Sequence, residues 1–499
     1  MALTEAGELY SPTLGLIYVF NLIVGTGALT MPKAFSAAGW LLSLILIIVL
    51  AFMSYVTVTF MGEAMSLANG YRRWMQGQDG SIQAADPGVA EEDSRDEVDE
   101  NAPLIVAVNR GNAGRTSRMF NITERIEMGP MAGLFFNRVG VNLFYFVMAI
   151  YLYGDLAIYA AAVPKSLRNV ACTYANNSNS SGFNQTTLIT EEDPCWESVP
   201  SISRMNAYRI FLGGFVLLLG PFVFFDVQKT KYLQIFTTLM RWTAFGMMVV
   251  LAAIYLAEGH GHGHPAVASF EGIPTLFGVC VYSFMCHHSL PSLVTPIRDK
   301  SRLYSLLAAD YTLILVFYCL LSFTGIFSFN RLLDLYTLNF EPSSFNPDEV
   351  PITEVPFIQY FLALFPVFTL STNFPIIGIT LRNNLKTLIL TEGKTYSFFT
   401  ERIFFPLITI IPPVIIAVVT LRIDFLVGVT GSYAGAGIQY IFPALLVWAA
   451  RRKVRNSMGT DLVSQHRSPF KNPAWVYFVI VWAVICIGVV TVNHILVGF

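Results

Sequence analysis

The sequence predicts an all-α membrane protein with eleven transmembrane helices, a five-plus-five inverted repeat with broken helices 1 and 6, and one extra helix. Composition is the first reason, because 54% of the 499 residues are hydrophobic and 13% are charged, which is too apolar for a soluble globule of this length. The second reason is that long apolar runs recur from end to end. The third is that two of these runs, five spans apart, contain residues that interrupt a helix.

Each expected span is an apolar run, since a bilayer core about 30 Å thick needs roughly 20 apolar residues per crossing. Eleven runs meet this length. They lie at residues 13–34, 37–61, 139–164, 208–226, 231–257, 272–291, 306–329, 355–380, 403–421, 425–449 and 474–496. Residues 1–12 contain no Lys or Arg, so we expect the first span to be the insertion signal and no cleaved leader.

The basic residues are unequally divided between the two sides of this topology. With residues 1–12 in the cytosol, the cytosolic loops hold 23 of the 31 Lys and Arg residues, including a cluster in the basic loop at 450–473. This is the distribution of the positive-inside rule. An odd number of spans then places the C-terminal end of 474–499 on the lumenal or extracellular side, in either an endolysosomal membrane or the plasma membrane.

The loop at 165–207 supports the same orientation. It contains three glycosylation sequons, at Asn176, Asn179 and Asn184, flanked by Cys172 and Cys195. Glycosylation and a disulfide both need the lumenal or extracellular compartment, which is the side that the basic residues avoid. We therefore expect glycans at the three asparagines and a disulfide between the two cysteines, although sequons also arise by chance in Asn- and Ser-rich loops.

The segment at 68–138 is expected to be a cytosolic loop that is acidic and largely disordered. Residues 86–101 contain eight acidic residues against one Arg, with too few apolar side chains for a packed core. This loop either binds a cytosolic protein partner or acts as a passive tether. After it, Asn121 to Glu124 has the pattern of a helix start, and apolar residues from Ile126 to Phe135 predict an interfacial helix lying on the membrane.

The first run contains NLIVGTGALTMP at residues 21–32, which is poorly suited to a continuous helix. Gly25 and Gly27 each weaken a helix by up to about 1 kcal/mol relative to Ala, and Pro32 removes a backbone donor. Irregular backbone at membrane depth is tolerated only where it faces protein or a wet cavity. We therefore predict a cavity here, where free amides attract a carboxylate and free carbonyls hold a cation. A harmless kink is the alternative.

The sixth run, FGVCVYSFMCHHSLPSLVTP, is the counterpart of the first, five spans later. Small and polar residues crowd its centre, and Pro291 and Pro296 lie at its end. Two interrupted helices at the first and sixth positions are the layout of an inverted-repeat transporter. The matched pair is more specific than either kink alone.

Three stretches carry a resemblance to a known family: GTGALTMPKAFSAAGW in the first span, FGVCVYSFMCHHSLPSL in the sixth and GVTGSYAGAGIQYIFPALLVW in the tenth. They resemble the amino acid/auxin permease family of the amino acid-polyamine-organocation superfamily. The likeness runs through nearly every span and fails in the acidic and glycosylated loops. It implies a LeuT-like five-plus-five fold and transport of amino acids. The resemblance is closest to an orphan member of the family, so it names no substrate.

The resemblance also implies which residues form the site. The unwound first helix would contact the amino acid moiety of the substrate, and the break in the sixth helix would complete the pocket. These positions are Val24, Gly25, Thr26 and Gly27 in the first helix, and Tyr282, Ser283 and Phe284 in the sixth. Ser371, Thr372 and Asn373 in the eighth span match the region that supplies hydroxyl ligands to a coupling sodium in sodium-driven relatives.

Arg241 departs from the pattern of a simple sodium symporter. It lies about 16 Å into the fifth span, near the bilayer midplane, where a charge costs at least about 2.5 kcal/mol and must face a partner or water. In some proton-coupled transporters of this fold a cationic side chain on the fifth helix occupies the space of the sodium site. We therefore expect Arg241 to be a fixed replacement for sodium. Alternatively, it extends to the cytosolic headgroups.

A different group must then carry the proton, since a guanidinium does not release one. Asp155 is the first candidate, because it lies in an otherwise uncharged stretch of the third span among tyrosines. His287 and His288 compete for this role, since imidazole titrates between pH 5 and 8. Each of these residues could instead be structural and bonded to its neighbours.

The sequence thus predicts a secondary active transporter of amino acids or similar small zwitterions, with H+ as the preferred coupling ion and Na+ as the other possibility. The alternative function, motivated by the acidic loop, is a nutrient sensor that binds the same ligand with little transport. An enzyme is not expected, because the spans contain no metal-ligand spacing, phosphate loop or nucleophile elbow. We expect no cofactor, metal or nucleic acid; the expected partners are the substrate, the coupling ion and the lipid bilayer.

Overall fold

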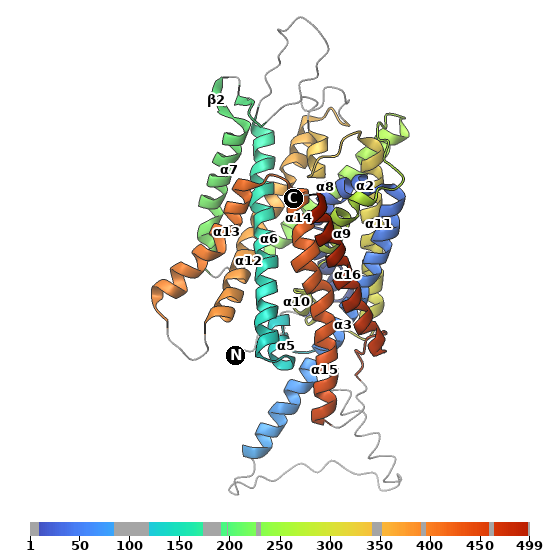
Figure 1. The fold of residues 1–499 in the computed structure, drawn as a ribbon, viewed down its shortest axis with the longest axis vertical. Coiled ribbons are helices and arrows are strands. Elements are labelled where there is room, and N and C mark those ends of the chain that lie inside the picture. The colour runs from blue at the N-terminus through green and yellow to red at the C-terminus, as the bar shows by residue number, and fades with distance from the viewer. Residues whose placement is uncertain are drawn as a thin grey trace, which may run out of the picture.

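The protein is a bundle of long helices that stand along one common axis (Figure 1). The computed structural model describes residues 9–83, 119–172, 191–196, 198–225, 231–341, 352–390, 396–458 and 464–497. Within these ranges the strands form one hairpin of β1 (Pro194–Trp196) and β2 (Val199–Ser203). The fold class is therefore the all-α membrane protein that the composition predicts.

The helices follow the expected apolar runs along the chain. The first part contains α1 (Pro12–Ile23), α2 (Thr26–Ala38), α3 (Trp40–Gln83), α5 (Met128–Phe135), α6 (Arg138–Ala171), α7 (Arg204–Leu219), α8 (Lys231–Ala257), α9 (Ile273–Ser283) and α10 (Leu290–Val294). The second part contains α11 (Leu303–Ser328), α12 (Pro356–Ile389), α13 (Phe405–Val419), α14 (Ile423–Thr430), α15 (Phe442–Met458) and α16 (Pro473–Val497). Short 3-10 segments are η1 (Gly220–Phe224), η2 (Phe270–Gly272) and η3 (Tyr336–Phe340); π-helical segments are η5 (Thr400–Phe404), η6 (Gly431–Gly435) and η7 (Gly437–Ile441).

Nine helical segments of the described chain are long and apolar enough to cross a membrane, or up to ten when α1 and α2 are taken as one bent span. Helices α9 and α10 are shorter, with 11 and 5 residues on either side of a non-helical stretch. Long apolar helices with lipid-facing side chains are what a bilayer requires. The structure thus agrees with a multi-pass membrane protein.

Helix α6 lies at the centre of the bundle and α16 at its edge. The apolar window of α6 is 72% buried and that of α16 only 22%. Helix α6 packs against α7, α12, α13 and α14, whereas α16 contacts α15, α9 and the two π-helical segments before α15. Figure 1 shows α6 running along most of the length of the bundle. Polar residues on α6 are therefore enclosed by protein, and α16 presents most of its surface to lipid.

Helix α3 continues beyond the predicted start of the loop at residue 68. It remains helical to Gln83 because its polar side chains bind the segment that follows the acidic stretch. The Ser66 hydroxyl donates to the carbonyl of Phe120 at 2.6 Å, and Asn69 accepts the amide of Glu124 at 2.8 Å. The expectation of a loop from residue 68 is thus wrong for 68–83, while the acidic residues 86–101 lie outside the described residues.

The interfacial helix predicted after the acidic stretch differs in position and surroundings. Asn121 to Glu124 is not helical, and α5 begins at Met128 with Glu127 at its N-cap. Met131 and Phe135 are buried against α3, α6 and α15, and Lys453 donates to the carbonyl of Leu134 at 2.6 Å. The apolar face of α5 therefore contacts protein, because neighbouring helix ends extend far enough to cover it.

The two ends of the bundle are distinct. One end, called the α5 end, contains α5 and the last turns of α15; the other, called the hairpin end, contains β2 (Figure 1). At the hairpin end a disulfide joins Cys172 to Cys195, the pair expected from the sequence. The three sequon asparagines of the same loop lie outside the described residues.

Candidate functional site

The first predicted break is present between α1 and α2. The two helices meet at 57°, with Val24 and Gly25 between them. Since the end of a helix leaves carbonyls without intrahelical partners, the last turn of α1 can accept hydrogen bonds from other helices. The carbonyl of Asn21 accepts one from the Arg241 guanidinium on α8, and that of Ile23 accepts one from the Tyr318 hydroxyl on α11 at 3.1 Å. The amides of Thr26 and Gly27, which begin α2, likewise have no partner within their helix.

The second break lies between α9 and α10. Helix α9 ends at Ser283, and residues 284–289 form turns before α10 begins. The two breaks are in direct contact, because a Cβ added at Gly27 would lie 2.3 Å from the Ser283 Oγ and 2.7 Å from its Cα. No side chain larger than hydrogen fits at position 27 without moving α9. The contact explains in physical terms why this position is glycine.

Two tyrosines of α11 bond to carbonyls at the breaks. Tyr318 bonds at both breaks, and Tyr311 bonds at the second. The Tyr318 hydroxyl lies 2.9 Å from the carbonyl of Ser283 as well as 3.1 Å from that of Ile23. Two helical turns closer to the α5 end, the Tyr311 hydroxyl lies 3.3 Å from the carbonyl of Phe284. The sequence analysis did not single out these residues, although their spacing of seven places both on one face of a helix.

Arg241 points into the bundle toward the first break. Its guanidinium donates to the carbonyl of Asn21, and Tyr159 and Tyr318 lie close to it. Phe20 of α1 stacks on Trp242 with ring centroids 4.4 Å apart, which holds α8 against α1 at this level. The C-terminal end of α1 carries partial negative charge, so a cation is stabilised there. The alternative in which Arg241 extends to headgroups does not agree with this contact.

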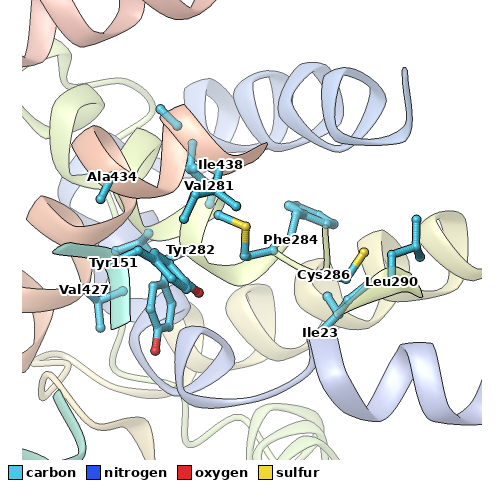
Figure 2. Close-up of a cluster of buried hydrophobic side chains, with 14 of the residues drawn as sticks. Ile23, Tyr151, Val281, Tyr282, Phe284, Cys286, Leu290, Val427, Ala434 and Ile438 are labelled. Carbon is cyan, nitrogen blue, oxygen red and sulfur yellow. The ribbon is translucent and has the colours of Figure 1, made fainter. Parts of the chain in front are cut away.

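Asp155 lies inside a group of tyrosines at the level of the breaks. It is 5% exposed, and the hydroxyl of Tyr282 on α9 is hydrogen-bonded to its carboxylate. One turn further along α6, Tyr159 is hydrogen-bonded to Thr26, the first residue of α2. Figure 2 shows Tyr151 next to Tyr282, and their ring centroids are 6.2 Å apart. Helix α6 therefore meets α9 through Asp155 and Tyr282, and α2 through Tyr159 and Thr26.

The remaining predicted residues occupy different surroundings. Phe284 packs against the rings of Tyr311 and Tyr318, with ring centroids 6.1 and 5.3 Å away, on the α11 side of the break. His287 is fully buried, with its Nε2 2.9 Å from the Thr57 hydroxyl on α3. The ring of His288 lies 5.5 Å from that of Tyr151.

The three polar residues expected at the sodium region are half-buried on α12: Ser371, Thr372 and Asn373. Thr372 donates to the carbonyl of Thr369 in its own helix at 2.9 Å. Helix α12 packs against both α6 and α8, which carry Asp155 and Arg241.

Buried polar atoms without a hydrogen-bond partner in the described protein gather on the elements around the two breaks. Eight of the eighteen described residues with such atoms lie on these elements: Asn21, Asp155, Arg241, His287, His288, Ser432, Gln439 and Tyr440. Buried polar groups are nearly always hydrogen-bonded, so such a concentration marks a place where polar ligands or water can bind. The pockets at Arg298 and at Leu315 do not include residues of the breaks, and the cavity expected there stays a prediction.

Asp310 is a second intramembrane carboxylate, which the sequence analysis overlooked. It lies on α11 beside Tyr311, is 3% exposed, and its Oδ2 is buried without a hydrogen-bond partner in the described protein. Its position two turns inside the start of an apolar helix was the available signal, because a charge at such a depth is costly.

Ion pairs join neighbouring elements at the hairpin end of the interrupted helices. Lys33 of α2 lies 3.2 Å from Asp424 of α14, and Lys165 of α6 lies 2.6 Å from Asp334. Asp334 also accepts the amide of Ile423 at 3.1 Å. Burial alone would raise the pKa of Asp334, but Lys165, Lys33 and the amide of Ile423 together outweigh it, and the pKa lies below the ordinary value. This carboxylate therefore stays charged at neutral and mildly acidic pH.

Comparison of the sequence with known proteins identifies the family of this chain. A family model described as "Transmembrane amino acid transporter protein" matches residues 10–74 and 116–492. The chain is 52% identical over 503 residues to transmembrane protein 104 of Homo sapiens, covering 99% of this chain and 98% of the relative. It is 46% identical to the transmembrane protein 104 homolog of Drosophila melanogaster, covering 98% of each chain. The Dictyostelium discoideum homolog is 33% identical, covering 97% of each chain. The chain therefore belongs to the transmembrane amino acid transporter protein family.

Proposed function

We propose that the protein carries an amino acid or a similar small zwitterion across the membrane by alternating access, coupled to H+. The observation that carries this proposal is the contact of two interrupted helices at Gly27 and Ser283, surrounded by buried polar atoms without partners. The amides that begin α2 are suited to a carboxylate, since the N-terminal end of a helix favours negative charge. The carbonyls around Ser283 are suited to an ammonium group.

In this proposal the substrate contacts the residues of the two breaks: Val24, Gly25, Thr26, Gly27, Tyr282 and Ser283. Phe284, packed toward α11, acts by holding the second break in place. Binding from one side and release to the other requires the ion pairs at the hairpin end to separate while the α5 end closes. We further propose that α9 and α10 together form one broken span, which makes eleven spans with the ten counted above.

The coupling part of the proposal assigns separate roles to two charged residues. Arg241 supplies the positive charge at the free carbonyl of Asn21, where a sodium ion would otherwise bind. Asp155 takes up and releases the proton, because it lies beside Tyr282 and has a second oxygen without a partner. His287 is bonded to Thr57 on its Nε2, so we place it among the residues that position α10.

The proposed orientation places the α5 end in the cytosol and the hairpin end in the lumen or outside the cell. Arg298 and Lys300, in the turn before α11, and Lys453, near the end of α15, lie at the α5 end, and the disulfide lies at the hairpin end. Both features follow the rules for basic residues and for disulfides.

Uptake into proteoliposomes tests the transport and its coupling. The purified full-length protein is reconstituted, and uptake of labelled amino acids is measured with an inward H+ gradient, with an inward Na+ gradient, and with neither. The proposal expects saturable uptake with the H+ gradient. Uptake that requires Na+ alone would contradict H+ coupling, and the lack of saturable uptake or exchange of any amino acid would contradict transport.

Two matched variants test whether Asp155 or Asp310 carries the proton. Asp155→Asn is expected to abolish uptake driven by the H+ gradient while preserving exchange of substrate across the membrane. Asp310→Asn is expected to retain gradient-driven uptake at a reduced rate. The opposite pattern would reassign the carrier to Asp310.

A further inference from the structure

A polar cavity of about 200 Å³ lies at the α5 end, away from the transport site. It is formed by three connections that are distant in the sequence: the segment after the acidic stretch, the turn between α10 and α11, and the connection between α15 and α16. The polar side chains that line it include Asn121, Thr123, Arg298, Lys300, Ser301 and His466. None of these residues has a part in the proposed transport cycle.

The three connections are held in place by hydrogen bonds to the bundle. The Tyr304 hydroxyl of α11 donates to the carbonyl of His466 at 2.5 Å, and the hydroxyls of Ser66 and Ser464 are hydrogen-bonded to each other at 2.7 Å. Arg73 of α3 donates to the carbonyl of Asn121 at 2.9 Å. The cavity is thus pre-formed, and a ligand would not have to order its walls on binding.

Positive charge exceeds negative charge in the lining of the cavity. The Arg298 guanidinium is exposed and makes no hydrogen bond or ion pair with a residue that the structure describes. The Lys300 ammonium donates to the carbonyl of Ile297 at 2.6 Å, and burial lowers its pKa. The one carboxylate in the lining, Asp299, accepts the amide of Ser301, which lowers its pKa. The lining therefore has an excess of positive charge and several neutral donors.

His466 indicates that a ligand of this cavity would accept hydrogen bonds. Its side chain is part of the lining, the residue is only 5% exposed, and its ring makes no hydrogen bond to the described residues. Burial and the nearby Lys300 lower the pKa of His466 to about 4, so the ring is neutral at cytosolic pH and offers one N–H donor. A neutral ring N–H in the lining of a cavity can donate to an oxygen of a ligand that enters it.

We propose that this cavity binds a phosphate monoester. Arg298 and Lys300 supply charge-assisted hydrogen bonds, and Ser301, Asn121 and His466 supply neutral donors to the remaining oxygens. The volume suits a single phosphorylated head group better than a peptide or nucleic acid. Its position at the end proposed to face the cytosol allows two sources, a soluble phosphate ester or a phosphorylated lipid head group. The inference does not depend on what the protein transports.

Binding is tested with the full-length protein purified in detergent and in lipid nanodiscs. In detergent, inorganic phosphate and inositol trisphosphate are titrated while the thermal unfolding midpoint and the heat of binding are measured. In nanodiscs of phosphatidylcholine, the same midpoint is compared with and without phosphatidylinositol bisphosphate. Stabilisation by inositol trisphosphate in detergent identifies a soluble source; stabilisation only by the lipid identifies a membrane source. If none of the three stabilises the protein, the proposal is overturned.

Matched variants test whether the ligand binds at Arg298 and Lys300. Arg298→Gln and Lys300→Gln are each expected to weaken binding roughly tenfold or more, because each removes a charge-assisted hydrogen bond. Arg467→Gln is the control, since Arg467 is exposed and adjacent to His466 but does not line the cavity. It should weaken binding less than about twofold. Equal losses in all three variants would indicate general attraction to basic residues and would overturn the site. Unfolding midpoints without ligand verify that each variant is folded.

Discussion

At the scale of single residues, Arg241 shows how an interrupted helix accommodates a charge at membrane depth. The break after α1 frees the carbonyl of Asn21, and the guanidinium of Arg241 bonds to it. The charge and the free carbonyl stabilise each other, whereas each alone would be costly in a medium of low dielectric constant. The same reasoning explains why a continuous first helix could not accept an arginine at this place.

The role of Arg241 is testable by removing its charge. We expect Arg241→Gln to lower H+-driven uptake at least about tenfold, because the free carbonyl loses a charged partner worth about 1.5–3 kcal/mol. If the guanidinium replaces a cation, raising the Na+ concentration should restore part of the uptake by this variant. Arg241→Lys is the control that keeps the charge and should retain more activity. Uptake by Arg241→Gln that equals the wild type would remove Arg241 from the coupling mechanism.

Glu341, at the hairpin end, is expected to make the stability of the fold depend on pH. Burial raises its pKa to about 8, and the nearby Arg204 and Arg168 only partly oppose this shift. The unfolded chain has the ordinary pKa of 4.5, so between these two values the folded protein binds more protons than the unfolded chain. This group therefore destabilises the fold progressively as pH rises from about 4.5 to about 8.

Glu341→Gln tests this dependence because glutamine resembles the protonated carboxyl. We expect its unfolding midpoint to exceed that of the wild type at pH 8 and to match it near pH 5. Thermal unfolding of both proteins at a series of pH values in one detergent measures the difference. An unchanged difference across the series would show that Glu341 has an ordinary pKa in the folded state.

At the scale of elements, the close packing of α2 on α9 decides how the two breaks meet. Gly27 makes this contact possible, and another glycine of α9 allows a second close approach, since a Cβ at Gly278 would lie 2.1 Å from the carbonyl of Gly428 on α14. Helices α2, α9 and α14 therefore approach backbone to backbone, as small residues allow in membranes. The π-helical segment η6, which follows α14 in the same glycine-rich run, also contacts α9.

A methyl group at Gly27 tests this packing. We expect Gly27→Ala to lower the free energy of unfolding by about 1–3 kcal/mol, because its Cβ would overlap Ser283 and force α2 and α9 apart. Gly246→Ala on α8 is the matched control, since nothing lies within 4 Å of the added Cβ and alanine favours the helix. Thermal unfolding and substrate binding of both variants are compared. Equal stability of the two variants would mean that the helices are further apart than described.

At the scale of the whole molecule, the ion pairs at the hairpin end join the moving parts of the proposed cycle. Lys33 belongs to a broken helix, and Asp424 lies at the start of the helical run from α14 to α15. Lys33 is about a third exposed, so solvent reduces the strength of this pair to at most about 1 kcal/mol. A pair of this strength is suited to opening and closing.

Charge exchange tests whether the pair holds that end shut. Lys33→Glu is expected to raise the rate at which a membrane-impermeant thiol reagent reaches Cys280 from the hairpin end, by roughly two- to fivefold. The double variant Lys33→Glu with Asp424→Lys should return the rate toward that of the wild type. A double variant that labels as fast as the single one would show that the pair has no role in closure.

The sequence by itself determined the features that depend on local composition. Apolar runs of sufficient length specified where helices cross the membrane, and Gly25, Gly27 and Pro291 marked both interrupted helices, because backbone pairing is a local property. The cysteine pair and the isolated charges Asp155 and Arg241 were visible for the same reason. The tertiary structure decided which partners these groups meet. The continuation of α3, the burial of α5, the bonds of Tyr318 to both breaks and the cavity beside His466 all depend on residues far apart in the chain. Such contacts are set by the packing of whole helices, and no local pattern encodes them.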